Sequence, residues 1–130
     1  GKAGDAGEAL RLSRALLPDC ERLLGPDHPD TLAVRANLAR WTGKAGDAGE
    51  ALRLSRALLP DCERLLGPDH PDTLAVRAHI ARWTGQAGDA AEALRLHQAL
   101  LPDCERLLGP DHPDTLTTRA HIARLMGTTK

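Results

Sequence analysis

Three copies of one short stretch, LLGPDHPDTL, carry the residues of this chain that most resemble a reactive loop. In the first copy Asp27, His28 and Asp30 lie close together, a set that could bind a metal ion. A metal site needs several ligands that converge on one point, and a single tight turn rarely provides them. Pro26 and Pro29 fix the backbone, and Asp27 or His28 can cap a following helix. We therefore interpret the stretch as a hinge between two helices, and we expect no metal and no cofactor. The copies occupy residues 23–32, 65–74 and 107–116.

The cysteines are the second candidate for chemistry. Cys20, Cys62 and Cys104 occur at intervals of 42 residues. Stacked helices lie about 8–10 Å apart, beyond the roughly 7 Å that a disulfide can bridge between Cα atoms. We therefore expect buried free thiols and a reducing compartment, the cytoplasm.

No other set of residues has the pattern of an enzyme. There is no convergent Ser–His–acid or Cys–His set, and GKAGDAGEA lacks the spacing of a phosphate-binding loop. The formal net charge of −1 predicts no strong attraction to nucleic acid or to an anionic membrane. No apolar run approaches the roughly 20 residues of a membrane span. We predict a protein that is not an enzyme and has neither nucleic acid nor membrane as a partner.

The 42-residue interval extends over the whole chain, dividing it into the units 1–42, 43–84 and 85–126, with a tail at 127–130. A fixed period of roughly 20–50 residues is typical of stacked repeats. We therefore predict one repeat domain that spans all 130 residues.

The units are nearly identical. Asn37 and Leu38 of the first become His79 and Ile80 in the second, and the third unit changes more. Such similarity indicates recent duplication or design, and does not show which residues are needed. The third unit differs from the second at Gln86, Ala91, His97, Gln98, Thr117, Thr118, Leu125 and Met126.

Each unit divides into a long and a short helix. The long helix of the first unit begins at Asp5, which has capping-box spacing to Glu8, and Gly25 ends it. Pro18 lies inside it, but the apolar phase continues, so we predict one kinked helix. The short helix begins at Pro29, a favoured first-turn residue. The predicted helices span residues 5–24, 29–42, 47–66, 71–84, 89–108 and 113–126.

These units resemble tetratricopeptide repeats. GKAGDAGEAL at residues 43–52 is similar to the family's turn pattern G-D-x-x-E-A, and Leu38 and Ala39 resemble the Leu–small pair of its first helix. Ala51 resembles the small residue where the two helices cross. The period and LGPDHPDT are similar to the long variant of kinesin light chains and many bacterial repeat proteins. The resemblance covers essentially the whole chain and implies an all-α, right-handed superhelical solenoid of six helices.

The chain departs from the family pattern at Arg35, Thr42 and Ser55, positions that are often large and apolar in the family. Arg35 lies near a buried seam, so its charge requires a partner. We expect an acid on the adjacent long helix.

The resemblance also implies a scaffold whose short helices line a concave groove that binds a protein or peptide. Ala33 and Ala36 keep the floor of that groove low. The short helix of the first unit carries more bases than acids, which favours an acidic or carboxylate-bearing partner. The expected groove residues are Asn37, Arg40, Lys44, His79, Arg82, His121 and Arg124.

The alternative is a structural, self-assembling repeat segment without a ligand. The chain begins with a long helix and ends with a short one, so its two end faces are complementary. This predicts weak head-to-tail association. Thr118 replaces a valine and Leu125 a tryptophan, which we expect to make the last face less adhesive.

Overall fold

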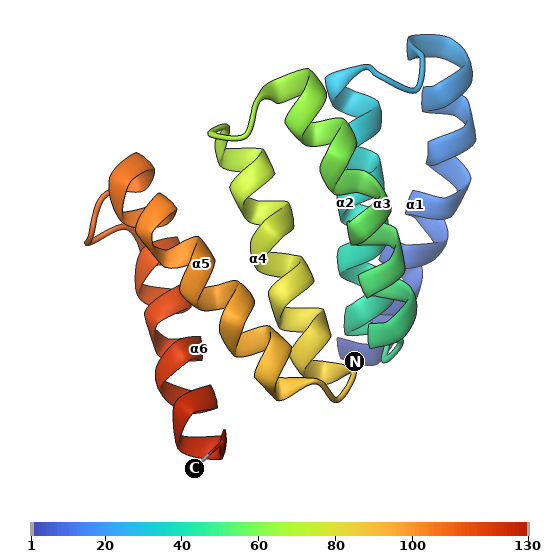
Figure 1. Cartoon of the computed structure of the whole chain (residues 1–130). Coiled ribbons are helices and arrows are strands. Elements are labelled where there is room, and N and C mark those ends of the chain that lie inside the picture. The colour runs from blue at the N-terminus through green and yellow to red at the C-terminus, as the bar shows by residue number, and fades with distance from the viewer. Residues whose placement is uncertain (1, 130) are drawn as a thin grey trace.

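A computed structural model of the protein shows a stack of six helices (Figure 1). The structure describes the backbone of residues 2–129 and the side chains of residues 7–127. Every regular element in this part is a helix, and neighbouring helices pack in succession, which confirms the predicted all-α repeat solenoid. The helices are α1 (Lys2–Leu24), α2 (Pro29–Lys44), α3 (Ala48–Leu66), α4 (Pro71–Gln86), α5 (Ala90–Leu108) and α6 (Pro113–Thr129).

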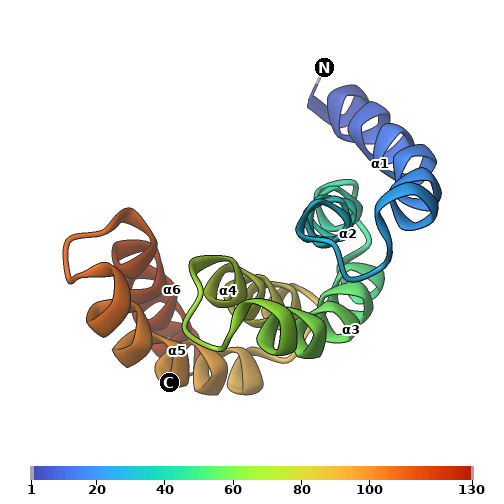
Figure 2. The same cartoon turned by 90° about the horizontal axis from the view of Figure 1, so that it is seen from above.

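The helices form a curved array (Figure 2). The short helices α2, α4 and α6 lie on the inner side of the curve, and α3 and α5 lie on the outer side. The inner surface is therefore built from the helices that were expected to line a groove. No helix in the described part is long and apolar enough to cross a membrane.

The short helices begin at a histidine cap. Nδ1 of His28 accepts a hydrogen bond from the N–H of Asp30 at 3.0 Å, and Pro29 follows at the first helical position. The hydroxyl of Thr31 donates to the carbonyl oxygen of Gly25 at 2.8 Å and ties the turn to the end of the preceding helix. The stretch therefore serves as the predicted hinge, with His28 as the cap. The same cap recurs at His70 and His112.

The long helices begin at an aspartate, but the predicted capping box is half formed. Oδ1 of Asp47 accepts from the N–H of Glu50 at 3.0 Å. The Glu50 carboxylate pairs with Arg53 and does not reach back, and the Asp47 N–H donates to an α2 carbonyl instead. Helix α1 begins at Lys2, ahead of the predicted start, and the cap proposed at Asp5 lies outside the described side chains. Glu8 pairs with Arg11 in the same way as Glu50 with its arginine.

The long helix continues through Pro18, and through its two counterparts, as one element. The first short helix runs two residues beyond the predicted end at Thr42, to Lys44. Gly43 remains helical, and the chain turns at Gly46, whose φ of 109° is unfavourable for other residues. The helix ends later than predicted because Gly43 keeps a helical conformation and only Gly46 takes the positive φ.

The core lies where the short helices cover the long ones. Leu58 and Cys62 of α3 are 1% and 3% exposed, and they pack with Leu32 of α2 and Val76 of α4. Helix α3 is therefore covered from both sides, and burial raises the pKa of the Cys62 thiol. The free cysteines are Cys20, Cys62 and Cys104, of which the first is only partly buried.

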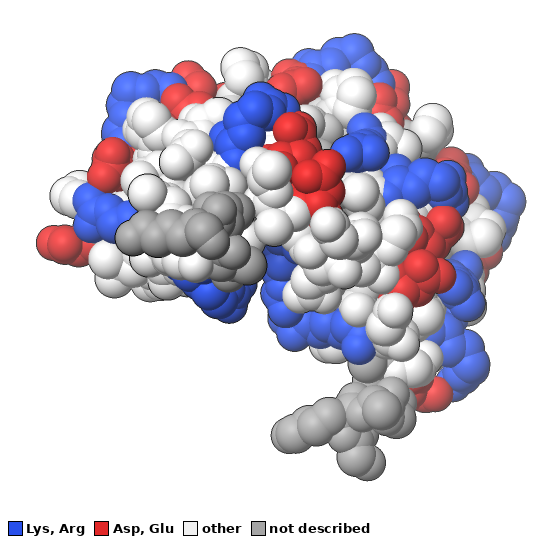
Figure 3. All heavy atoms as spheres, turned by 60° about the horizontal axis from the view of Figure 1, so that its bottom comes forward, with Lys and Arg blue, Asp and Glu red and all other residues white. Residues whose placement is uncertain are grey.

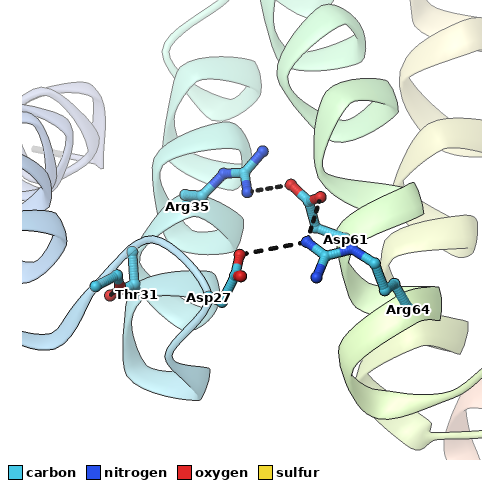
Figure 4. A network of polar contacts seen from close by, with 6 residues as sticks. Asp27, Thr31, Arg35, Asp61 and Arg64 are labelled. Atoms are coloured by element: carbon cyan, nitrogen blue, oxygen red, sulfur yellow. Dashed lines mark hydrogen bonds and ion pairs between the residues drawn. The ribbon is translucent and has the colours of Figure 1, made fainter.

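Ion pairs near the turns fasten neighbouring units (Figure 4). Arg35 of α2 pairs with Asp61 of α3 at 2.7 Å, and Arg64 bridges Asp61 at 3.2 Å and Asp27 at 3.3 Å. The hydrogen bond from Arg35, followed by that from Arg64, lowers the pKa of Asp61 although partial burial opposes them. Arg35 thus has the expected acidic partner on the adjacent long helix. The second junction repeats this network with Arg77, Asp103, Arg106 and Asp69.

Two substitutions of the third unit lie inside the array and not on the end face. Thr118 is 3% exposed and lies against α5, and Leu125 lines a hollow together with Gly85 of α4. The outer face of α6 instead exposes Leu116 and Met126, each at 48%. The expectation that Thr118 and Leu125 make the end face less adhesive was wrong. Helical spacing shows which residues share one side of a helix, but it does not reveal which neighbouring helix that side contacts.

Candidate protein-binding groove

The residues predicted to face the groove lie on the accessible side of the short helices. Asn37, Arg40 and Lys44 are exposed on α2. Their spacing of three or four residues places them on one face of that helix. The counterparts are His79 and Arg82 on α4, and His121 and Arg124 on α6, where the histidines are partly buried and the arginines exposed.

A hollow of about 220 Å³ lies between α2 and α4. Ala33 and Ala36 are part of its lining, as expected for a low groove floor. Asn37, His79 and Asp72 supply polar groups, and side chains of α3 close the hollow from behind. Small side chains at these positions leave room for the backbone of a bound segment.

A second hollow of about 190 Å³ lies between α4 and α6 and has more polar residues in its lining. It brings together His79 and Arg82 of α4 and His121 of α6, three of the predicted residues. Asp114 also lines it, as the acidic exception. A side chain from the long helix α5, His97, joins them, although it was not among the predicted groove residues.

The histidines of this half of the groove lie in a positive field. Burial lowers the pKa of His79, Arg40 and Arg82 lower it further, Asp114 opposes them, and Lys44 adds a smaller lowering. Among the described side chains, no carboxylate pairs with Arg40 or Arg82. In Figure 3, Lys and Arg side chains border the notch at the lower middle of the molecule, whereas Asp and Glu lie mostly elsewhere on that face. This surface therefore presents basic groups that few acids compensate.

Three of the basic groups lie over tryptophan rings. The guanidinium carbon of Arg40 lies 5.1 Å from the ring centre of Trp41, and that of Arg82 lies 4.8 Å from the ring centre of Trp83. The Lys44 ammonium is 5.7 Å from the Trp41 ring. Such cation–π contacts favour one side-chain position and leave the charge available to a ligand.

His97 reaches the groove from behind. It is 2% exposed and stacks on His121, with ring centres 4.9 Å apart and an angle of 18° between the planes. Burial, His121 and Arg124 together lower the pKa of His97 to about 4, so the ring is neutral at pH 7. Burial first, then Arg124, also lowers the pKa of His121. The sequence signal that could have pointed to His97 is its replacement of Ser55 between otherwise similar units. The sequence does not show, however, that this position reaches the groove.

The histidines and cysteines do not gather into a metal centre where side chains are described. No group of three or more His, Cys, Asp or Glu in that part could hold an ion. Nδ1 of His28 is engaged in capping, and the groove imidazoles lie beside arginines.

Two protein-family models, both described as Tetratricopeptide repeat, match the sequence. One matches residues 1–60 and the other residues 73–114. A crystal structure of nearly identical TPR-like repeats, from a Podosopora anserina protein assigned as a kinesin light chain, is similar with a TM-score of 0.84. The identity is 27% over 94% of this chain, and this chain spans 58% of that one. A single-substitution variant of the same protein matches equally, with 57% of its chain covered. No protein with a curated description matches the sequence.

Proposed function

Because the chain belongs to the tetratricopeptide repeat family, a family of repeat scaffolds that generally mediate protein–protein interaction, we propose that its concave groove binds a peptide segment of a partner protein. We propose further that this segment carries carboxylates. The observation that supports this is the positive field over the groove, where Arg40 and Arg82 lack acidic partners among the described residues and, after burial, further lower the pKa of His79.

The geometry suits an extended acidic segment. Arginine binds a carboxylate through two parallel charge-assisted hydrogen bonds, which are stronger than neutral ones. Arg40, Arg82 and Arg124 recur at intervals of 42 residues on successive inner helices, so they form a row along the groove. The alanines between them allow the ligand backbone to lie close to the helices.

A charge-reversal pair tests the proposal with a matched control. The double variant Arg40→Glu/Arg82→Glu changes the groove, and Arg14→Glu/Arg56→Glu makes the same charge change at exposed positions of α1 and α3. Fluorescence anisotropy would measure binding of a labelled Glu-rich decapeptide and of its Gln-substituted analogue. We expect the Glu peptide to bind more tightly, and the groove variant to weaken it by about tenfold or more, since hydrogen bonds between charged groups contribute about 1.5–3 kcal/mol.

The control variant should stay within about threefold of the original protein, because long-range attraction alone is screened at physiological salt. Equal binding of the two peptides, or equal losses in both variants, would exclude a basic groove as the binding surface. Circular dichroism should show unchanged helicity in both variants.

A second candidate function is end-to-end association of chains, and the exposed apolar residues at the two ends favour it. Leu58 on α3 is 1% exposed because short helices cover it, whereas its counterpart on α1, Leu16, is 49% exposed. On α6, Leu116 is 48% exposed, whereas its counterpart on α4, Leu74, is 3% exposed. These two faces correspond to the two sides of an internal junction, so they are complementary.

The charges at the ends are complementary too. Asp19 on α1 pairs with Arg22 of its own helix at 3.2 Å, where its counterpart Asp61 also receives an arginine from the preceding short helix. Arg119 on α6 corresponds to that arginine, and it turns back to Glu105 at 2.6 Å. Association would join Asp19 of one chain to Arg119 of the next and complete the network.

Sedimentation velocity over a wide concentration range tests this candidate. We expect the sedimentation coefficient to rise with concentration, and Asp19→Arg or Arg119→Asp alone to reduce the rise. The double variant Asp19→Arg/Arg119→Asp restores complementarity with the charges exchanged and should recover the association. A monomer at all concentrations up to about millimolar, the range of weak encounters, would rule it out.

We also propose the cytoplasm as the setting of this interaction. The three cysteines are free, and two of them are buried. Free thiols are typical of proteins in reducing compartments.

A further inference from the structure

The first junction between units provides an internal reference for how the space between helices is filled. Trp83 of α4 is 1% exposed, and its ring lies directly over Gly43 of α2, where an added Cβ would overlap the ring atoms. Ser55 of α3 is buried as well, at 1% exposure. The pair of a large indole and a small serine thus fills the first junction.

The second junction has the opposite pair and is not filled. Leu125 stands at the position of the tryptophan, and His97 stands at the position of the serine. An added Cβ on Gly85 would meet the Cβ of Ala93 at 3.3 Å, with no ring above it. A hollow of about 200 Å³ remains, and all four of these residues line it.

His97 gives this hollow a polar group without a partner. The side chain is 2% exposed, and no described residue forms a hydrogen bond with its Nδ1. A buried polar atom without a partner is costly, and such atoms usually have a ligand, a water or a strained state to explain them. The lowered pKa of His97 keeps the ring neutral, so one of its two nitrogens can accept a hydrogen bond.

We propose that this hollow between α4, α5 and α6 is a binding site for a planar aromatic ring of indole size that carries an N–H donor. The bound ring would lie over Gly85, as Trp83 lies over Gly43, and its N–H would donate to the imidazole of His97. The choice of ring follows from the first junction, where an indole occupies the equivalent space. The hollow shares Arg82, His121 and Arg124 with the expected groove residues, but indole carries no carboxylate, so its binding can be tested separately from that of the proposed peptide.

Titration with indole and with 1-methylindole, followed by amide chemical shifts, tests the proposal. We expect indole to shift the amides of Gly85, Ala93 and Leu125, and to leave those of Gly43 and Ala51 unchanged. Methylation removes the donor, so 1-methylindole should bind about three- to tenfold more weakly. N-acetyltryptophanamide separates two sources of the ring: if it binds like indole, a tryptophan side chain can use the site, and if only indole binds, the ligand is a free heteroaromatic molecule.

The double variant His97→Ser/Leu125→Trp reproduces the residue pair of the first junction and fills the hollow. It should weaken indole binding at least about tenfold, a loss of about 1.4 kcal/mol. Gln98→Arg restores another second-unit residue at an exposed position and should leave indole binding unchanged. The single variant His97→Ser should remove the preference for indole over its methylated analogue, which keeps the test valid if the double variant fails to fold.

Absence of indole binding, shifts at the first junction as large as at the second, or full binding by the filled variant would each overturn the proposal.

Discussion

Lowering the pH from 7 to 4 should remove stability that depends on one buried side chain, His97. Its folded pKa is lowered from 6.5 to about 4, first by burial and then by His121 and Arg124. The unfolded chain therefore binds a proton that the folded protein resists. The stabilisation is complete above about pH 6.5 and is lost as the pH falls from there toward 4.

The size of this loss follows from the two pKa values. Each tenfold difference in proton affinity corresponds to about 1.4 kcal/mol, so the shift of His97 to about 4 amounts to about 3 kcal/mol between pH 7 and pH 4. Domains are typically stable by about 5–15 kcal/mol, so a single imidazole would account for a considerable share.

Urea unfolding followed by circular dichroism, in steps of one pH unit, measures this loss. The matched variant is His97→Ser, because serine occupies the same position in both other units. The variant lacks the titrating ring but keeps His79, His121 and all carboxylates, so the difference between the two stabilities reports the ring of His97 together with its effect on the stacked His121. We expect that difference to change by about 3 kcal/mol in favour of the variant as the pH falls. If the two stability curves remain parallel from pH 7 to pH 4, the burial argument for His97 is refuted.

The repeated units allow two further matched comparisons. The side chain of Leu58 is 1% exposed, so Leu58→Ala should lower the free energy of unfolding, measured in urea, by about 2–5 kcal/mol. Leu16 occupies the same place in the first unit but is 49% exposed, so Leu16→Ala should lower it by less than about 1 kcal/mol. Equal losses would show that α1 is covered in solution. Gly43→Ala should lower the free energy of unfolding by about 1–3 kcal/mol, because the new methyl group overlaps the ring of Trp83. In Gly85→Ala the new methyl group meets one neighbour at 3.3 Å, so the melting temperature should stay unchanged or rise slightly. A loss at Gly85 as large as at Gly43 would contradict the difference in packing between the junctions.

The helix order could be predicted because the signals are local. Pro29 and Asp47 mark helix starts through the φ of proline and the acceptor of a carboxylate, and neither signal depends on distant residues. The helix end near Gly43 could not be placed from the sequence, since the second of two nearby glycines, Gly46, takes the positive φ.

The contacts between helices could be predicted only in kind. An acid on the next long helix was expected for Arg35, but its identity as Asp61, 26 residues away, depends on how the two helices are rotated and aligned. For the same reason Thr118 and Leu125 were assigned to the wrong side of their helix. The exposure of Arg40, Arg82 and Arg124 could be predicted, because exposed charged positions follow from the polar side of each short helix, whereas their role in binding stays a prediction.

The unequal packing of the two junctions has a mechanical consequence. At the turn edge both junctions have the same ion-pair network, with Arg35 and Asp61 in the first and Arg77 and Asp103 in the second. At the opposite edge the first junction is filled by Trp83, but the second retains a hollow. The first junction should therefore be stiffer than the second. The space between α4 and α6 should widen more readily than the space between α2 and α4. A partner that lies along the whole inner surface would contact a rigid part between α2 and α4, which fixes its register. It would also contact a more flexible part between α4 and α6, which adjusts to its shape.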